Sequence, residues 1–172
     1  NRQSLPHRVA CLLLWASMCS ARHEPCLCRP ASVPPEAIPS ELMPSIFIET
    51  TIPSYYFETR RDRRTIDWRA QTRLWWDRYA TAYQLVTSEF VIAEYLRAPS
   101  VKSAQAARFF SGVTVLPIPN RFEEVVSTYI SERVMPAGER GDAAHLAVAS
   151  LHAVDFVLTW LGISARSIHV SV

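Results

Sequence analysis

Short apolar runs alternate with segments of helical periodicity along most of the chain. Residues 45–48, 83–87, 113–118 and 155–160 are rich in β-branched and aromatic residues, which is typical of strands. Between these runs, most clearly over 65–80, apolar residues recur every three or four positions, which indicates amphipathic helices. Strands that alternate with helices predict an α/β domain, in which a parallel sheet is covered by helices on both faces.

Capping and breaking residues indicate where several of these helices begin and end. Ser88 is a suitable N-cap for the helix that follows the second strand and ends near Pro99. Gly112 stops a helix over 102–110, and Asn120 is expected to cap a helix over 121–134.

The N-terminal part differs in character from the rest. Residues 10–18 are apolar and loosely imitate an export signal, whereas residues 20–42 are Pro-rich and aperiodic. Met43 stands directly before the first strand. We therefore expect residues 1–42 to be disordered or upstream read-through and residues 43–160 to form the domain. Export stays open as the alternative, but the apolar run is too short to span a membrane, and a cytoplasmic protein is expected.

Composition narrows the function only slightly. The 172 residues are 49% hydrophobic, enough for one core, and the net charge of +2 does not identify a polyanionic partner. All four cysteines fall in the first 28 residues, so the predicted fold needs no disulfide. The four glycines form no GxGxxG motif, which disfavours a nucleotide cofactor.

Three acidic residues are placed so that they could meet at one rim of the predicted sheet. Glu49 directly follows the first strand, Glu94 lies about a turn and a half into the helix after the second strand, and Asp142 opens a later helix. Ligands of parallel α/β sheets bind beyond the carboxyl ends of the strands. Three carboxylates in one crevice would repel one another unless a divalent cation lay between them, and hard oxygen ligands suit Mg²⁺.

Each acid also has an ordinary structural explanation. Glu49 is equally suited to a helix start, Asp142 to an N-terminal cap, and Glu94 to a solvated position on an amphipathic helix. Their joint placement favours the metal site.

Three segments carry a family resemblance: IFIETTIPSYY (46–56), VTSEFVIAEYLRA (86–98) and, most specifically, GDAAHLAVASLHAVDFVLTW (141–160). Together they closely resemble a branch of the PIN-domain proteins, the group that includes the VapC-type toxins of bacterial toxin–antitoxin systems. The resemblance covers about residues 43–160. It implies a three-layer α/β/α sandwich, an Mg²⁺ or Mn²⁺ site, endoribonuclease activity, a cognate antitoxin and a homodimer.

The resemblance also assigns roles to single residues. Glu49 takes the place of the first-strand acid, which is usually Asp in the wider family, and Glu94 and Asp142 take the second and third positions. The implied mechanism is metal-assisted hydrolysis of an RNA phosphodiester. Thr50 or Thr51 is expected to position a water or a phosphate oxygen.

Besides Thr50, two further residues are expected beside the metal ligands. His145 lies on the same helical face as Asp142, and the alternative is that it simply packs between helix and sheet. Thr159 belongs to the same C-terminal motif as Trp160 and is the second expected neighbour of the ligands.

The chain departs from the family after Trp160. Position 161 is Leu where this branch has Asn, and where the wider family brings in a fourth acid. The tail 161–172 lacks the expected helix and final strand and resembles an out-of-frame ending. The fourth corner of the metal site is therefore missing, and impaired activity is expected. The alternative function is a catalytically inactive PIN-like binding or regulatory protein.

A basic cluster follows the first-strand loop. Its members, Arg60, Arg61, Arg63 and Arg64, could hold RNA backbone phosphates, although a solvated turn explains them equally well. Trp68, Trp75 and Trp76 could stack on bases, but aromatic residues at helical spacing are more often packing groups.

Overall fold

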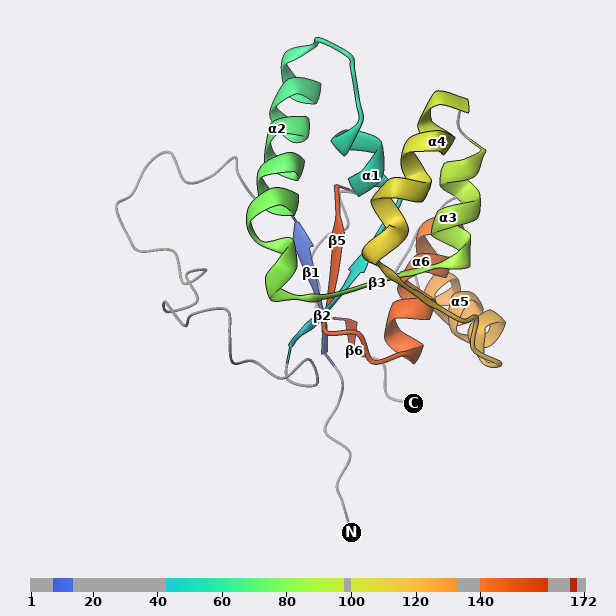
Figure 1. Ribbon diagram of the computed structural model, residues 1–172. Coiled ribbons are helices and arrows are strands. Elements are labelled where there is room, and N and C mark those ends of the chain that lie inside the picture. Colours follow the sequence, from blue (N-terminus) through green and yellow to red (C-terminus); the bar gives the residue numbers. More distant parts are fainter. Residues whose placement is uncertain (1–7, 14–42, 98–99, 133–139, 161–167, 170–172) are drawn as a thin grey trace.

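The computed structural model describes residues 8–13, 43–97, 100–132, 140–160 and 168–169 (Figure 1). The strands are β1 (Arg8–Leu13), β2 (Ser45–Ile48), β3 (Gln84–Ser88), β4 (Thr114–Leu116), β5 (Phe156–Thr159) and β6 (Ile168–His169). The α-helices are α1 (Thr51–Tyr56), α2 (Arg63–Arg78), α3 (Glu89–Leu96), α4 (Ser100–Phe109), α5 (Phe122–Ser131) and α6 (Arg140–Leu151), with short 3-10 turns at Ala80–Ala82 and Phe110–Gly112.

The strands form one sheet in the order β4-β3-β2-β5-β1-β6. All neighbouring pairs are parallel except β1 with β6. The central strands β2 and β5 are in register, with Ile48 opposite Leu158, and the backbone N–H of Glu49 continues the ladder to the Leu158 carbonyl at 3.3 Å. Glu49 and Thr159 therefore reach the same rim of the sheet, at the carboxyl ends of these strands.

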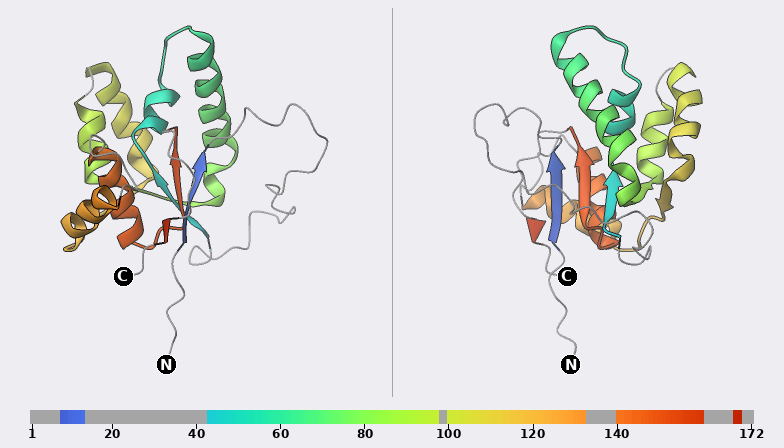
Figure 2. Two further views of the ribbon diagram at one scale, coloured as in Figure 1. Left: turned by 180° about the vertical axis from the view of Figure 1, so that it is seen from behind. Right: turned by 60° about the vertical axis from the view of Figure 1, so that its left-hand side comes forward.

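Helices cover both faces of the sheet, as the two further views show (Figure 2). Alternate residues of β2 point to opposite faces. Phe47 packs in a core with residues of α5 and α6, whereas Ile46 and Ile48 pack with Ile52 of α1 and Trp76 of α2. The expected α/β sandwich on a central parallel sheet is thus confirmed.

Two predicted caps have different outcomes. The Ser88 hydroxyl accepts a hydrogen bond from the Val91 backbone N–H at 3.4 Å, so Ser88 caps α3 as expected. The prediction for Asn120 is wrong, because a turn closed by the Phe122 N–H on the Pro119 carbonyl precedes α5. The helix consequently begins at Phe122, after Arg121, and receives no side-chain cap.

The N-terminal segment contributes to the sheet, which corrects the expectation for part of residues 1–42. Strand β1 pairs in parallel with β5 from Ala10 opposite Phe156 to Leu13 opposite Thr159. Its other edge pairs with β6. The sequence alone does not reveal this strand, because a short apolar run is identified as a strand only through the strands with which it pairs. Residues 1–7 and 14–42, and the tail apart from 168–169, lie outside the described residues.

Asp155 joins the amino-terminal ends of β2 and β5, at the side of the sheet away from Glu49. Its carboxylate accepts hydrogen bonds from the Ser45 backbone N–H and from the Ser45 hydroxyl, both at 2.8 Å. Asp155 thus directly precedes β5 and lies away from the rim that carries Glu49.

Candidate metal and RNA site

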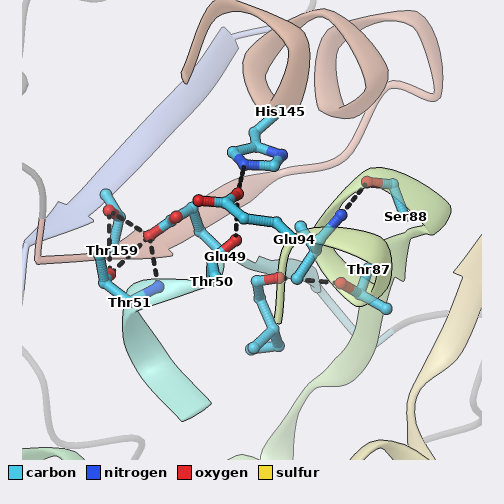
Figure 3. A network of polar contacts seen from close by, with 10 residues as sticks. Glu49, Thr50, Thr51, Thr87, Ser88, Glu94, His145 and Thr159 are labelled. Carbon is cyan, nitrogen blue, oxygen red and sulfur yellow. Dashed lines mark hydrogen bonds and ion pairs between the residues drawn. The ribbon is translucent and has the colours of Figure 1, made fainter. Parts of the chain in front are cut away.

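Glu49 is an acid placed inside the core. It is 3% exposed and comes directly after the buried strand β2. One of its oxygens, Oε2, accepts three hydrogen bonds: from the Thr51 backbone N–H at 2.9 Å, from the Thr51 hydroxyl at 2.5 Å and from the Thr159 hydroxyl at 2.9 Å (Figure 3). These donors replace the water that burial removes, which is why a carboxylate is tolerated here.

Thr51 connects this carboxylate to Trp160. The Thr51 hydroxyl donates to Glu49 and accepts from the Trp160 backbone N–H at 2.9 Å. The Trp160 indole stacks on Trp68 with ring centroids 4.7 Å apart and donates to the Thr72 hydroxyl at 2.8 Å. The rim beyond β5 is therefore fixed by α1 and α2, and Thr51 rather than Thr50 supports Glu49.

Glu94 approaches the same place from α3. Its Oε2 accepts hydrogen bonds from the Thr50 hydroxyl at 2.8 Å and from His145 Nε2 at 3.0 Å. These bonds, with that from His145 the stronger influence, hold the pKa of Glu94 below its ordinary value, although partial burial opposes them. The side chain remains 50% exposed, so it is reachable from solvent.

His145 comes from α6 and is buried. Its ring lies 6.3 Å from the Phe47 ring, and its Nδ1 is buried without a hydrogen-bond partner among the described residues. An ionised carboxylate only accepts hydrogen bonds, so Nε2 is the donor in the contact with Glu94. The three residues expected beside the ligands, Thr50, His145 and Thr159, all contact either Glu49 or Glu94.

Asp142 lies in the first turn of α6, three residues before His145, and is half-buried. The structure brings Glu49 and Glu94 together through Thr50 and Thr51. Within the described ranges, however, no three acidic, histidine or cysteine side chains are grouped closely enough to hold a metal ion. The convergence of all three acids on one cation therefore stays a prediction.

The two glutamates nevertheless present free ligand atoms. Every hydrogen bond recorded from the described residues to either carboxylate ends on Oε2. Figure 3 shows the two carboxylate groups facing one another, with their other oxygens between them. Hard, unshared carboxylate oxygens are what Mg²⁺ and Mn²⁺ prefer, so the donor set fits such an ion.

The four arginines of the basic cluster differ in their contacts. Asp62, inside the cluster, caps α2 by accepting from the Thr65 N–H at 3.0 Å, and Arg60 pairs with Glu58 at 3.0 Å. The Arg64 guanidinium lies 4.1 Å over the Trp68 ring. Arg61, Arg63 and Arg64 form no ion pair with any described residue.

The tryptophans serve mainly as packing groups. Trp76 stacks on Phe109 with centroids 3.8 Å apart, and Trp75 stacks on Tyr83. Trp68 is the exception, since its ring joins Trp160 at the rim to Arg64 of the basic cluster.

Comparison with solved structures identifies a protein of the same fold. The chain is similar to VapC20 of Mycobacterium tuberculosis, described as a sarcin–ricin loop cleaving toxin, with a TM-score of 0.52 and 20% sequence identity. The match covers 73% of this chain and 98% of VapC20. No model of a protein family and no curated protein sequence matches the chain. The expected likeness to VapC-type proteins is therefore confirmed at the level of the fold.

No helix in the described part of the chain is both long and apolar enough to cross a membrane.

Proposed function

We propose that this chain is a metal-dependent endoribonuclease of the VapC type, the toxin of a bacterial toxin–antitoxin pair. The observation that supports this most is the pairing of Glu49 with Glu94. Each carboxylate has Oε2 saturated by fixed donors, and the two groups face one another at the rim where parallel sheets bind ligands. A protein gains no stability from leaving two acids opposed, so the arrangement favours a cation between them.

In this proposal Glu49, Glu94 and Asp142 hold Mg²⁺ or Mn²⁺. When bound, the ion lowers the pKa of a water and offsets charge on the scissile phosphate. Thr51 and Thr159 orient Glu49 by donating to its Oε2. Thr50 and His145 do the same for Glu94.

RNA would be held by the unpaired part of the basic cluster. Arg64 is kept near the rim by Trp68, whose neighbour Trp160 is bonded to Thr51. A guanidinium fixed over an aromatic ring loses little entropy when it binds a phosphate. We therefore expect the RNA backbone to pass Arg64, and Arg61 and Arg63 to attract it with further positive charge.

The proposed partners follow from the VapC likeness. They are an RNA substrate, a cognate antitoxin and a second copy of the chain, all in the cytoplasm. Because VapC20 is described as cleaving the sarcin–ricin loop, that ribosomal hairpin is the first substrate to test.

A second candidate is a PIN-like binding protein without turnover. It is favoured by one observation: the part of the chain that the structure describes groups no third ligand with Glu49 and Glu94. Such a protein would bind RNA but leave it intact.

The deciding experiment is an RNA cleavage assay with the full chain. A sarcin–ricin hairpin and an unstructured oligonucleotide are incubated with Mn²⁺, with Mg²⁺ and with EDTA. We expect weak cleavage with either metal, none with EDTA, and none for Glu94→Gln, which keeps the side-chain shape.

The matched control is Glu132→Gln, an exposed acid at the end of α5 that should cleave like the wild type. Binding of RNA without cleavage by the wild type would favour the second candidate. Cleavage that persists in EDTA and in Glu94→Gln would refute the proposed function.

A further inference from the structure

Two donors from different parts of the fold converge on one oxygen of Glu94. Thr50 comes from the link between β2 and α1, and His145 comes from α6, yet both bond to Oε2. A half-exposed glutamate on a helix normally exchanges among several rotamers, and fixing it costs about 1.5–2 kcal/mol of side-chain entropy. Here the hydrogen bonds from Thr50 and His145 offset that entropy loss.

Among the described residues, the only hydrogen-bond partner of the His145 side chain is Glu94. The ring is 3% exposed, packs beside Phe47, and leaves Nδ1 buried without a partner in the structure as described. A buried polar atom without a partner is costly. The cost is tolerated, we reason, because the other nitrogen must be delivered to Glu94 from a rigid helix.

Thr50 links the position of Glu94 to that of Glu49. Thr50 directly follows Glu49 in the sequence, and Glu49 is itself fixed by Thr51 and Thr159. A movement of Glu94 away from Thr50 would therefore also be a movement away from Glu49. The two carboxylates are held as one unit across β2 and α3.

We propose that Thr50 and His145 are positioning residues that form a clamp on Glu94, holding its Oε1 toward Glu49 before any cation arrives. The clamp rests on the proposed function, because it prepares the carboxylate for the same ion. Neither residue touches the ion or the RNA. Their effect is to lower the reorganisation needed for binding.

Isosteric substitutions separate this role from simple packing. In His145→Gln the side-chain amide nitrogen takes approximately the place of Nε2, so a donor to Glu94 is retained. In His145→Asn the amide nitrogen takes the place of Nδ1 and cannot reach Glu94. Both variants remove the ring, so both should lose similar packing and melt at similar temperatures.

The test is Mn²⁺ binding to the full chain, measured by titration calorimetry without RNA. We expect His145→Asn to weaken Mn²⁺ binding by about 10-fold or more, and His145→Gln to stay much closer to the wild type. Thr50→Val and Thr50→Ser form a second pair, in which Ser keeps the hydroxyl donor. Should both His145 variants fail to fold, the Thr50 pair decides.

The outcomes distinguish the clamp from the function on which it rests. If the wild type binds Mn²⁺ and the Gln and Asn variants bind it equally, as do the Thr50 variants, the clamp is refuted and the proposed metal site stands. If the wild type binds no Mn²⁺, the proposed function fails and the clamp fails with it.

Discussion

The Thr159 hydroxyl donates a 2.9 Å hydrogen bond to the carboxylate of Glu49 across two neighbouring parallel strands. Both residues are buried, and the bond exists because Ile48 of β2 lies opposite Leu158 of β5. Register alone brings a residue near position 50 to one near position 160. The acid and its donor are thus a property of the sheet rather than of a flexible loop.

Thr51 should be important for stability as well as for the site. Thr51→Val removes a donor from the buried Glu49 carboxylate and an acceptor from the Trp160 N–H. We expect a loss of about 2 kcal/mol in the free energy of unfolding, measured by urea denaturation. Thr51→Ser keeps both bonds and should lose clearly less. Equal stability of the Val variant and the wild type would contradict the hydrogen-bond network.

The Glu94 carboxyl should titrate below its ordinary pKa of 4.5, because His145 and Thr50 donate to its ionised form. A lowered folded-state pKa contributes stability above the unfolded pKa, and this contribution is lost as the pH falls through the folded pKa. The titration can be followed by carbon-13 NMR of the side-chain carboxyl group in the metal-free chain. We expect the midpoint to rise in His145→Asn and to change less in His145→Gln. An unchanged midpoint in the Asn variant would show that the bond is not formed in solution.

Strand β1 should stabilise the domain through its backbone. Cys11 lies inside β1, opposite Val157, in a strand that has neighbours on both sides. Cys11→Pro removes a backbone donor from the strand and should lower the melting temperature. Cys11→Val suits a strand and serves as the control. If the two variants melt together at the wild-type temperature, β1 is not part of the stable sheet.

Arg64 should contribute more to RNA binding than a paired arginine does. Affinity for a single-stranded oligonucleotide, measured in EDTA to prevent cleavage, should fall in Arg64→Gln. The slope of the logarithm of this affinity against the logarithm of the salt concentration should decrease in magnitude by about 0.7, because one phosphate contact is lost. Arg121→Gln, in which the lost guanidinium was paired with Glu124 at 2.8 Å, should show neither change. Equal behaviour of the two variants would place the RNA elsewhere.

Local patterns in the sequence were enough to predict the parallel sheet and most of its helices. Glu49 after an apolar strand and Ser88 before an amphipathic helix both obey rules that depend on a few neighbouring residues. The family resemblance added Thr159 as a neighbour of the acids, and the helical spacing from Asp142 added His145. Their actual partners, Glu49 and Glu94, follow from strand register and helix packing.

Other features depend on contacts that no local pattern contains. The segment 8–13 is a strand only because β5 has an edge to pair with. From the sequence, Thr51 is an ordinary turn residue. Its role becomes visible only through the hydrogen bond that its hydroxyl accepts from the Trp160 backbone N–H. Whether Asp142 joins Glu49 and Glu94 depends on side-chain positions around a bound ion, which sequence spacing does not determine.

The central claim is that Glu49 and Glu94 share a divalent cation, with Asp142 as the third ligand. The most direct measurement is the anomalous scattering of Mn²⁺ in crystals of the full chain grown with that ion. We predict an anomalous peak in contact with the carboxylates of Glu49 and Glu94, and its disappearance in Glu94→Gln crystals. No peak there, or a peak bound only by other residues, at a Mn²⁺ concentration that supports RNA cleavage, would contradict the claim.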